Sequence, residues 1–218
     1  MGAHSSSDSE ALRPSHSDRY AASVSIERIL GIHGNVFAQP LPFHFRLPNG
    51  ISAKDAIAWT FRQYLNAREE GREFVWLDEY DEVADWLSDN HGRGLLLYGH
   101  CGLGKTLLAR HILPFIYERV FRRLFRHFDA SDLTTNLDYI LSSNICTIDD
   151  VGTEPISQFR SVGFADVVDQ AEKKNRLLII TTNLDAEGLK ERYGDRVIDR
   201  LAHVTKRVLF TNAESLRR

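Results

Sequence analysis

The segment 99–106 reads Gly-His-Cys-Gly-Leu-Gly-Lys-Thr and fits the pattern GxxxxGK followed by Ser or Thr at every fixed position. Its glycines let backbone N–H groups approach phosphate oxygens without a clash from a Cβ atom. The Lys105 ammonium can reach the β- and γ-phosphates of a nucleotide, and the Thr106 hydroxyl can bind Mg²⁺. We therefore predict that this segment binds the nucleotide through Gly99, His100, Cys101, Gly102, Leu103, Gly104, Lys105 and Thr106.

Two carboxylates, Asp149 and Asp150, follow the apolar run 145–148. If that run is a buried strand, both lie at the sheet edge where doubly wound folds hold their ligands. Asp149 is suited to hold Mg²⁺ through water, and Asp150 to orient the water that attacks the nucleotide. Many such enzymes have Glu at the second position, so the shorter Asp150 leaves the rate of hydrolysis open. The alternative is an Asp-Asp turn that caps the next helix.

A polar amide, Asn183, follows the next apolar run, 177–180, after two threonines. At a strand end beside the phosphate site it can hydrogen-bond the γ-phosphate or the attacking water. The alternative is an Asx turn or a helix cap, because Asn-Leu-Asp is a good helix start. The residues after Asn183 are Leu-Asp, which differs from the Lys-x-Asp of guanine-specific GTPases, so adenine is favoured.

Arg196 and Arg200 are four residues apart in an expected helix, with His203 close in line. Apolar residues about 120° away can take the core face, so we expect both arginines to point outward. They form either an ordinary solvated face or a catalytic pair. In the second case, one arginine reaches the γ-phosphate bound by an adjacent subunit and stabilises transition-state charge.

Short apolar runs separated by helix-like segments are typical of strands buried on both faces of a parallel sheet. We expect strands at 94–98, 124–128, 144–148, 177–181 and 207–210. This alternation predicts a three-layer α/β fold. Helices are expected from Ser52 to about Ala67 and after Asp78, with a split near Pro114 and a new start capped by Asp195.

The chain has 218 residues, with 27 Lys and Arg against 30 Asp and Glu. This balance excludes a polycationic coat for nucleic acid. The two cysteines, Cys101 and Cys146, are far apart, which argues against a disulfide framework and a Cys-rich zinc site. No apolar run is long enough to cross a membrane and no signal pattern opens the chain, so we expect a cytoplasmic protein without a membrane partner. Residues 1–50 read as a flexible tail with a possible partner-docking segment, and residues 51–218 as the main domain.

Four segments together resemble the bacterial helicase-loader family, the DnaC- and IstB-like AAA+ ATPases. They are GHCGLGKT at 99–106, TIDDVGTEP at 147–155, LLIITTNL at 177–184 and RYGDRVIDRL at 192–201. The resemblance implies a P-loop fold of the AAA+ type, here without a C-terminal lid domain. It implies residue roles as follows: Lys105 and Thr106 as the Walker A pair, Asp149 and Asp150 as the Walker B pair, Asn183 as sensor 1, Arg200 as the arginine finger and Arg196 as a second arginine beside it.

The same resemblance implies an ATPase that uses ATP and Mg²⁺ and assembles into open rings or filaments on single-stranded DNA. Its partner would be a replicative helicase, which it loads or remodels, or a transposase. A nucleotide or small-molecule kinase is an alternative of another class, although no arginine-rich lid is inserted between the expected strands. A nucleotide-gated binding module that hardly hydrolyses ATP is a third reading, left open by Asp150.

The densest basic cluster lies between residues 119 and 127, with phenylalanines interleaved. Its basic members are Arg119, Arg122, Arg123, Arg126 and His127, and its aromatic members are Phe121, Phe125 and Phe128. Arginines with aromatics suit single-stranded nucleic acid through phosphate contact and base stacking. The alternative is that the phenylalanines belong to a core strand and the arginines to an ordinary charged helix end.

Overall fold

A computed structural model describes residues 43–68, 73–155 and 162–211. These all belong to one of the two compact units of the chain, Pro40–Arg218, and the other unit, Met1–Gln39, lies outside the described residues. Most of the predicted tail, 1–50, therefore lies outside them too. Among the described helices, none combines the length and the apolar character needed to span a membrane.

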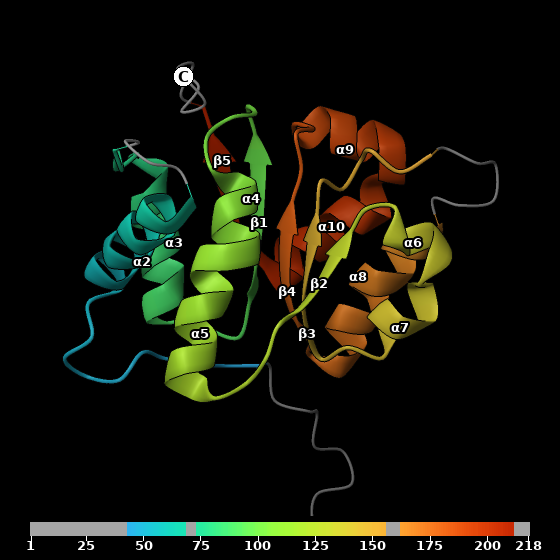
Figure 1. Ribbon diagram of the computed structural model, residues 1–218. Helices are drawn as coiled ribbons and strands as arrows, with labels where there is room; N and C mark the ends of the chain where they lie inside the picture. Colours follow the sequence, from blue (N-terminus) through green and yellow to red (C-terminus); the bar gives the residue numbers. More distant parts are fainter. Residues whose placement is uncertain (1–42, 69–72, 156–161, 212–218) are drawn as a thin grey trace, which may run out of the picture. The chain divides into compact units, whose positions relative to one another are not determined.

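The described chain builds one sheet of five parallel strands in the order β2-β3-β4-β1-β5 (Figure 1). The strands are β1 (Gly94–Gly99), β2 (Arg126–Asp129), β3 (Ile145–Asp149), β4 (Leu177–Thr181) and β5 (Thr205–Phe210). Because all strands run the same way, their carboxyl ends meet at one edge, which holds the 99–106 segment and the carboxylates after β3. The predicted α/β fold with a parallel sheet is confirmed.

Helices cover both faces of this sheet (Figure 1). One face carries α2 (Ala53–Arg68), α3 (Glu79–Ser88) and a helical stretch made of α4 (Lys105–Leu107), a π-helical turn η1 (Leu108–Ile112) and α5 (Leu113–Phe121). The other carries α6 (Asp132–Thr135), α7 (Leu137–Leu141), α8 (Val162–Lys174), α9 (Ala186–Tyr193) and α10 (Asp195–Val204). Because these helices bury the central strands on both faces, most side chains of those strands are apolar.

The central strands feed two separate cores because successive side chains point to opposite faces. In β1, Leu95 and Leu97 pack under α3 and α5, whereas Leu96 packs with the α8 and α10 side. In β4, Leu178 and Ile180 join Leu96 in the second core. This two-sided burial explains why the runs lack the polar alternation of a half-exposed strand.

Strand bounds differ from the sequence prediction by one or two residues in every strand except β4, and the largest differences are at the starts of β2 and β5. Strand β2 starts at Arg126 rather than at residue 124, because Leu124 lies 77% exposed and the Phe125 N–H donates to Glu118 Oε1 at 3.2 Å. Strand β5 starts at Thr205, two residues earlier than predicted, and pairs along its whole length with β1.

The helix starts also differ in part. Ser52 Oγ accepts a hydrogen bond from the Asp55 N–H at 3.2 Å, so the predicted start of α2 is confirmed. The helix predicted after Asp78 is confirmed as α3, which begins at Glu79, although the Asp78 side chain makes no cap bond to it. Gly194 both ends α9 and precedes α10, while Asp195 is the first helical residue and pairs with Lys190 at 2.9 Å, so the predicted Asp195 cap is wrong.

The helical stretch after the glycine-rich loop does not break at Pro114 but passes through the π-helical turn just before it. There the Leu113 N–H donates to the Leu108 carbonyl, one residue further back than in an α-helix. The Ala109 carbonyl is thereby left without a helical donor, and Pro114 has no N–H to supply one. The Thr147 hydroxyl of β3 donates to it instead at 2.9 Å, in a buried position. This bond ties the helix to the strand that leads to Asp149.

We expect Thr147→Val to lower the free energy of unfolding by about 1–3 kcal/mol, because it leaves the buried Ala109 carbonyl without a donor. Urea denaturation measures the change. Thr147→Ser keeps the hydroxyl and is the matched control, expected to lose less. Equal stabilities for the Val variant and the wild type would contradict the assigned role.

Candidate nucleotide-binding site

The glycine-rich loop after β1 depends on backbone angles that other residues rarely adopt. Gly99, Gly102 and Gly104 have φ of +106°, +82° and +81°. A Cβ on Gly104 would lie 2.6 Å from the Tyr80 hydroxyl oxygen, which donates to the Leu103 carbonyl at 3.1 Å. Tyr80 comes from α3 and supports the loop through this contact, a role that no local sequence pattern predicts. Burial raises the pKa of its phenol.

The Lys105 ammonium is buried and bound on three sides. It donates to the carbonyls of Gly99 at 2.9 Å and His100 at 2.6 Å, and to Asn183 Oδ1 at 3.0 Å. The loop and the end of β4 therefore meet at this cation. A positive charge held at a glycine-rich loop that leads into a helix is suited to receive phosphate oxygens.

Asn183 also contacts the residues after β3: its Nδ2 lies 3.4 Å from Asp150 Oδ1. Thr181, the last residue of β4, fixes both carboxylate positions. Its hydroxyl donates to Asp149 Oδ1 at 2.5 Å and accepts the Asp150 N–H at 2.8 Å, which holds Asp150 at a φ of +56°. The structure thus brings together Lys105, Asn183 and the two carboxylates that the sequence singled out from three separate segments.

Asp149 has two further charged neighbours that the sequence prediction missed. Arg110, from the π-helical turn, lies with its Nη1 2.5 Å from Asp129 Oδ1 and 3.7 Å from Asp149 Oδ2. Asp129 is the residue of β2 that pairs in register with Asp149. The only signal in the sequence was a carboxylate at the end of the strand before β3.

The residues at this edge fit a nucleotide with Mg²⁺. Asp149 is buried, with one oxygen held by Thr181, and Thr106 follows Lys105 at the start of α4. A hydroxyl and a carboxylate are the hard oxygen donors that Mg²⁺ prefers, completed by water and phosphate. Within the ranges that the structure describes, no group of three or more His, Cys, Asp or Glu could hold a metal alone, so the phosphates would be needed.

The two candidate arginines of α10 differ in exposure and in their ion pairs. Arg196 is exposed, as expected, but Arg200 is not: it is ion-paired with Asp169 and lies 3.2 Å from Glu172 Oε2 with its Nε. The predicted outward direction of Arg200 is therefore wrong, because two acidic residues on α8 face it. A hydrogen bond from Lys173 and the charge of Arg200 hold the pKa of Asp169 below its usual range. Among the described contacts, none joins Arg200 to the glycine-rich loop of its own chain.

The loop after the two carboxylates is held by a second polar network. Glu154 is buried, accepts the Gly152 N–H at 2.8 Å and bonds the Tyr193 hydroxyl and the Arg192 guanidinium. Burial, together with Glu154, raises the pKa of Tyr193. The segments Thr-Glu-Pro at 153–155 and Arg-Tyr-Gly at 192–194, far apart in the sequence, therefore meet in one contact, which attaches the loop after β3 to the end of α9.

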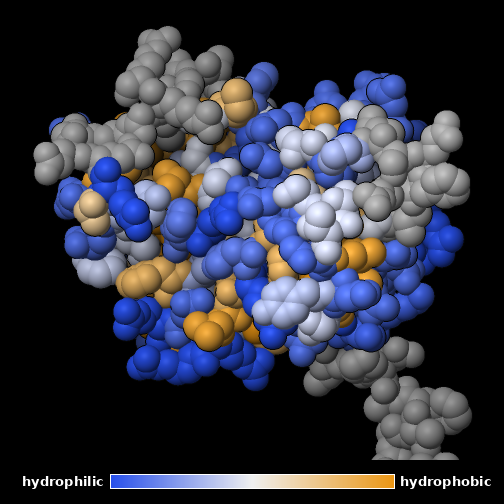
Figure 2. Space-filling view, turned by 45° about the vertical axis from the view of Figure 1, so that its right-hand side comes forward, coloured by the Kyte–Doolittle hydropathy of each residue, from blue (hydrophilic) through white to orange (hydrophobic). Residues whose placement is uncertain are grey.

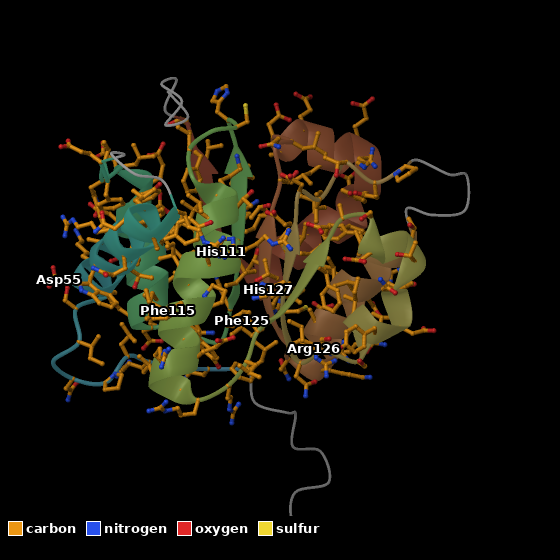
Figure 3. The ribbon with its side chains drawn as sticks, in the orientation of Figure 1. Asp55, His111, Phe115, Phe125, Arg126 and His127 are labelled. Atoms are coloured by element: carbon orange, nitrogen blue, oxygen red, sulfur yellow. The ribbon has the colours of Figure 1, made fainter. Side chains whose placement is uncertain are left out.

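Two imidazoles lie near Arg110. His111 follows it in the helical stretch and His127 comes from β2 (Figure 3). Burial and the charge of Arg110 lower the pKa of both histidines, with Arg68 contributing at His111. At neutral pH both are therefore uncharged, and Arg110 is the cation of this cluster.

The sheet order, the glycine-rich loop after β1 and the carboxylates after β3 define a P-loop NTPase of the AAA+ type. The chain belongs to the family of IstB-like ATP binding proteins, whose sequence pattern matches residues 82–218. The resemblance to DnaC- and IstB-like AAA+ ATPases is thereby confirmed.

Solved structures agree on the fold. The crystal structure of the DnaC helicase loader has 22% identity and a TM-score of 0.54, over 69% of this chain and 99% of that one. DnaA from Aquifex aeolicus bound to AMPPCP has 16% identity and a TM-score of 0.51, over 66% of this chain and 50% of that one. At these identities the likeness extends to the fold alone. No curated protein sequence gives a significant match.

The lowered pKa values of His111 and His127 predict a pH dependence of stability. Below the ordinary histidine pKa of about 6.5, the unfolded chain binds protons that the folded protein does not. The contribution of the two histidines to the free energy of unfolding should therefore be at its full value above that pH. It should fall as the pH decreases towards the folded-state pKa values. Urea denaturation at several pH values measures the slope, which should become shallower in the double variant His111→Asn/His127→Asn. An unchanged slope would contradict the assignment.

Proposed function

We propose that this protein is an ATPase that binds ATP with Mg²⁺, assembles on single-stranded DNA and loads or remodels a replicative helicase. The observation that supports it most is the meeting of Lys105 with Asn183 and of Asn183 with Asp150 at the glycine-rich loop. An ammonium group that can bind phosphate, a polar amide and a carboxylate in successive contact are groups that nucleotide hydrolysis uses.

Each residue has a role that its position allows. Lys105 exchanges its bonds to the Gly99 and His100 carbonyls for the β- and γ-phosphate oxygens. Asp150 accepts a proton from the attacking water, and Asn183 orients that water or the γ-phosphate between Lys105 and Asp150. Thr106 and Asp149 would hold Mg²⁺, which would supply positive charge to the β- and γ-phosphates.

Arg200 acts on the nucleotide of a neighbouring subunit, with Arg196 beside it on α10. In the single chain, Arg200 is held by Asp169 and Glu172 on α8. Assembly would exchange these two carboxylates for the γ-phosphate of the neighbour, which gathers a similar charge on one group with several acceptor oxygens. Hydrolysis would then depend on oligomerisation, which is the behaviour expected of a finger supplied in trans.

A surface for single-stranded DNA lies where α5 ends and β2 begins. We define this arginine–aromatic surface by Arg119, Arg122, Arg123, Arg126, Phe43, Phe115, Leu124 and Tyr139. Three of its guanidinium groups lie over aromatic rings. The distance from the guanidinium Cζ to the ring centroid is 5.2 Å for Arg119 and Phe115, 5.3 Å for Arg123 and Phe43, and 4.5 Å for Arg126 and Tyr139. Within the described part of the chain, no carboxylate forms an ion pair with its four arginines.

The aromatic residues that can stack on bases differ from those the sequence suggested. Phe125 and Phe128 are buried in the two cores, whereas Tyr139 is 55% exposed and Phe115 38%. Figure 3 shows Phe115 and Arg126 in the half of the molecule away from the glycine-rich loop. The face seen in Figure 2 is mostly hydrophilic, with separate small apolar patches rather than one continuous patch. Such a surface suits a phosphate backbone with bases stacked on isolated rings.

A transposase remains the other candidate partner, since the family match is to IstB-like ATP binding proteins and the fold match includes a helicase loader. Incubation of the ATP-bound protein with a purified replicative helicase or a purified transposase, followed by size-exclusion chromatography, distinguishes the two. Co-elution with the transposase alone would replace the helicase in this proposal.

Steady-state ATP hydrolysis with and without single-stranded DNA tests the proposed activity. We expect Lys105→Ala to lower the rate about 100-fold or more, and Arg200→Ala about 1000-fold if the finger works in trans. A mixture of the two variants should regain activity, because an intact Arg200 of one subunit can serve an intact Lys105 of another.

Arg62→Ala, an exposed arginine on α2, is the matched control and should hydrolyse ATP like the wild type. Full activity of Arg200→Ala, with no response to DNA, would argue against the finger and favour a kinase or a passive nucleotide switch. Transfer of phosphate to a small acceptor at full rate by the monomer would identify a kinase.

Fluorescence anisotropy of a labelled oligo-dT tests the arginine–aromatic surface. We expect Arg119→Ala/Arg126→Ala to weaken binding about tenfold or more. The slope of log affinity against log salt should fall by about 1.4 for two lost phosphate contacts. The control is again Arg62→Ala, because Arg62 also stacks on a ring, Phe74 at 5.7 Å, but lies outside this surface. Wild-type affinity in the double variant would exclude this surface.

A further inference from the structure

Two carboxylates stand side by side at the carboxyl edge of the sheet. Strands β2 and β3 pair in parallel with Asp129 opposite Asp149, so both side chains leave the sheet on the same face. Neighbouring like charges repel each other, and a cation between them relieves the repulsion. Arg110 is that cation in this structure: its Nη1 is 2.5 Å from Asp129 Oδ1 and 3.7 Å from Asp149 Oδ2.

The two carboxylates are not equivalent. The side chain of Asp149 is 4% exposed, and its Oδ1 already accepts the Thr181 hydroxyl, so Oδ2 is the oxygen that faces Arg110. The side chain of Asp129 is 57% exposed and forms the shorter contact. Arg110 therefore hydrogen-bonds the outer carboxylate and stops short of the inner one, which is the carboxylate assigned above to Mg²⁺.

Arg110 is fixed on this side by the helix that carries it. It lies in the middle of the π-helical turn Leu108–Ile112, and the residue before it, Ala109, is bonded to Thr147 of β3. The backbone of this turn is thus attached to the same strand that ends in Asp149. The Cα of Arg110 is therefore held near both carboxylates, and its guanidinium lies within 3.7 Å of each of them.

We propose that Arg110 competes with Mg²⁺ for Asp149 and that Asp129 weakens this competition by holding the guanidinium to itself. This inference rests on the proposed function, since it takes Asp149 as a ligand of the nucleotide-bound Mg²⁺. Arg110 and Asp129 are positioning residues here. Their balance sets how strongly Mg²⁺ tightens nucleotide binding.

The proposal predicts opposite effects for two substitutions that each remove one charge. Arg110→Gln removes the competitor, so Mg²⁺ should strengthen nucleotide binding more than in the wild type. Asp129→Asn releases Arg110 towards Asp149, so Mg²⁺ should strengthen binding less. If each charge acted on Mg²⁺ directly and independently, the two single variants would also shift Mg²⁺-dependent binding in opposite directions. Asp129→Asn would then have the same effect in the Arg110→Gln background as in the wild type. If Asp129 acts only through Arg110, Asp129→Asn should have no effect in that background.

The experiment measures the affinity of a fluorescent, non-hydrolysable ATP analogue in excess Mg²⁺ and in EDTA. The quantity compared is the affinity in Mg²⁺ divided by the affinity in EDTA. We expect the ratio to rise about tenfold in Arg110→Gln and to fall about tenfold in Asp129→Asn. The double variant should match Arg110→Gln alone. Arg62→Gln, which removes an exposed arginine from α2, should leave the ratio unchanged.

The outcomes separate this inference from the proposed function. Failure of the wild type to bind the analogue in Mg²⁺ would overturn both. Binding by the wild type with additive effects in the double variant, or with no change in Asp129→Asn, would overturn the inference alone. Thermal denaturation without nucleotide confirms that each variant is folded. If Arg110→Gln is unstable, Arg110→Met takes its place, alone and combined with Asp129→Asn, because the comparison needs a variant without the guanidinium.

Discussion

The hydroxyl of Thr181 connects the parts of the site that strand pairing alone would leave apart. It donates to Asp149 and accepts the Asp150 N–H, so one side chain of β4 sets both carboxylates at the end of β3. The next polar residue, Asn183, contacts Lys105 and Asp150. Because the strands are parallel and in register, all these groups meet at one edge without any loop having to be long.

Local patterns were sufficient to predict the parallel sheet, the glycine-rich loop and the residues Lys105, Asp149 and Asn183. Those features depend on short apolar runs and on glycine spacing, which are visible in a window of a few residues. Contacts between elements distant in sequence were not predictable in this way. Tyr80 under the loop is one example, and the ion pair of Arg200 with α8 is another. Charge and spacing on one helix cannot reveal which acidic residues another helix presents to it.

Two arginines near the predicted chemistry are held by carboxylates of their own chain. Arg110 is held by Asp129, and Arg200 by Asp169 with Glu172. In each case the partner is partly exposed, so solvent screens the pair and limits its strength. Because these pairs are partly open to solvent, each guanidinium can exchange its partner at a lower cost than it could from a fully buried pair.

The π-helical turn before Pro114 decides which face α5 presents to the sheet. A π-helical turn takes in one residue more than an α-helical turn, so the same residues wound as a regular α-helix would turn the chain by about 100° further. All of α5 would then rotate against the sheet, and Tyr117, which is buried against Phe45 and Phe125, would leave its place in the core. The less regular helix is the one that fits, because it absorbs the extra residue between Lys105 and Pro114 and keeps the packing of everything that follows.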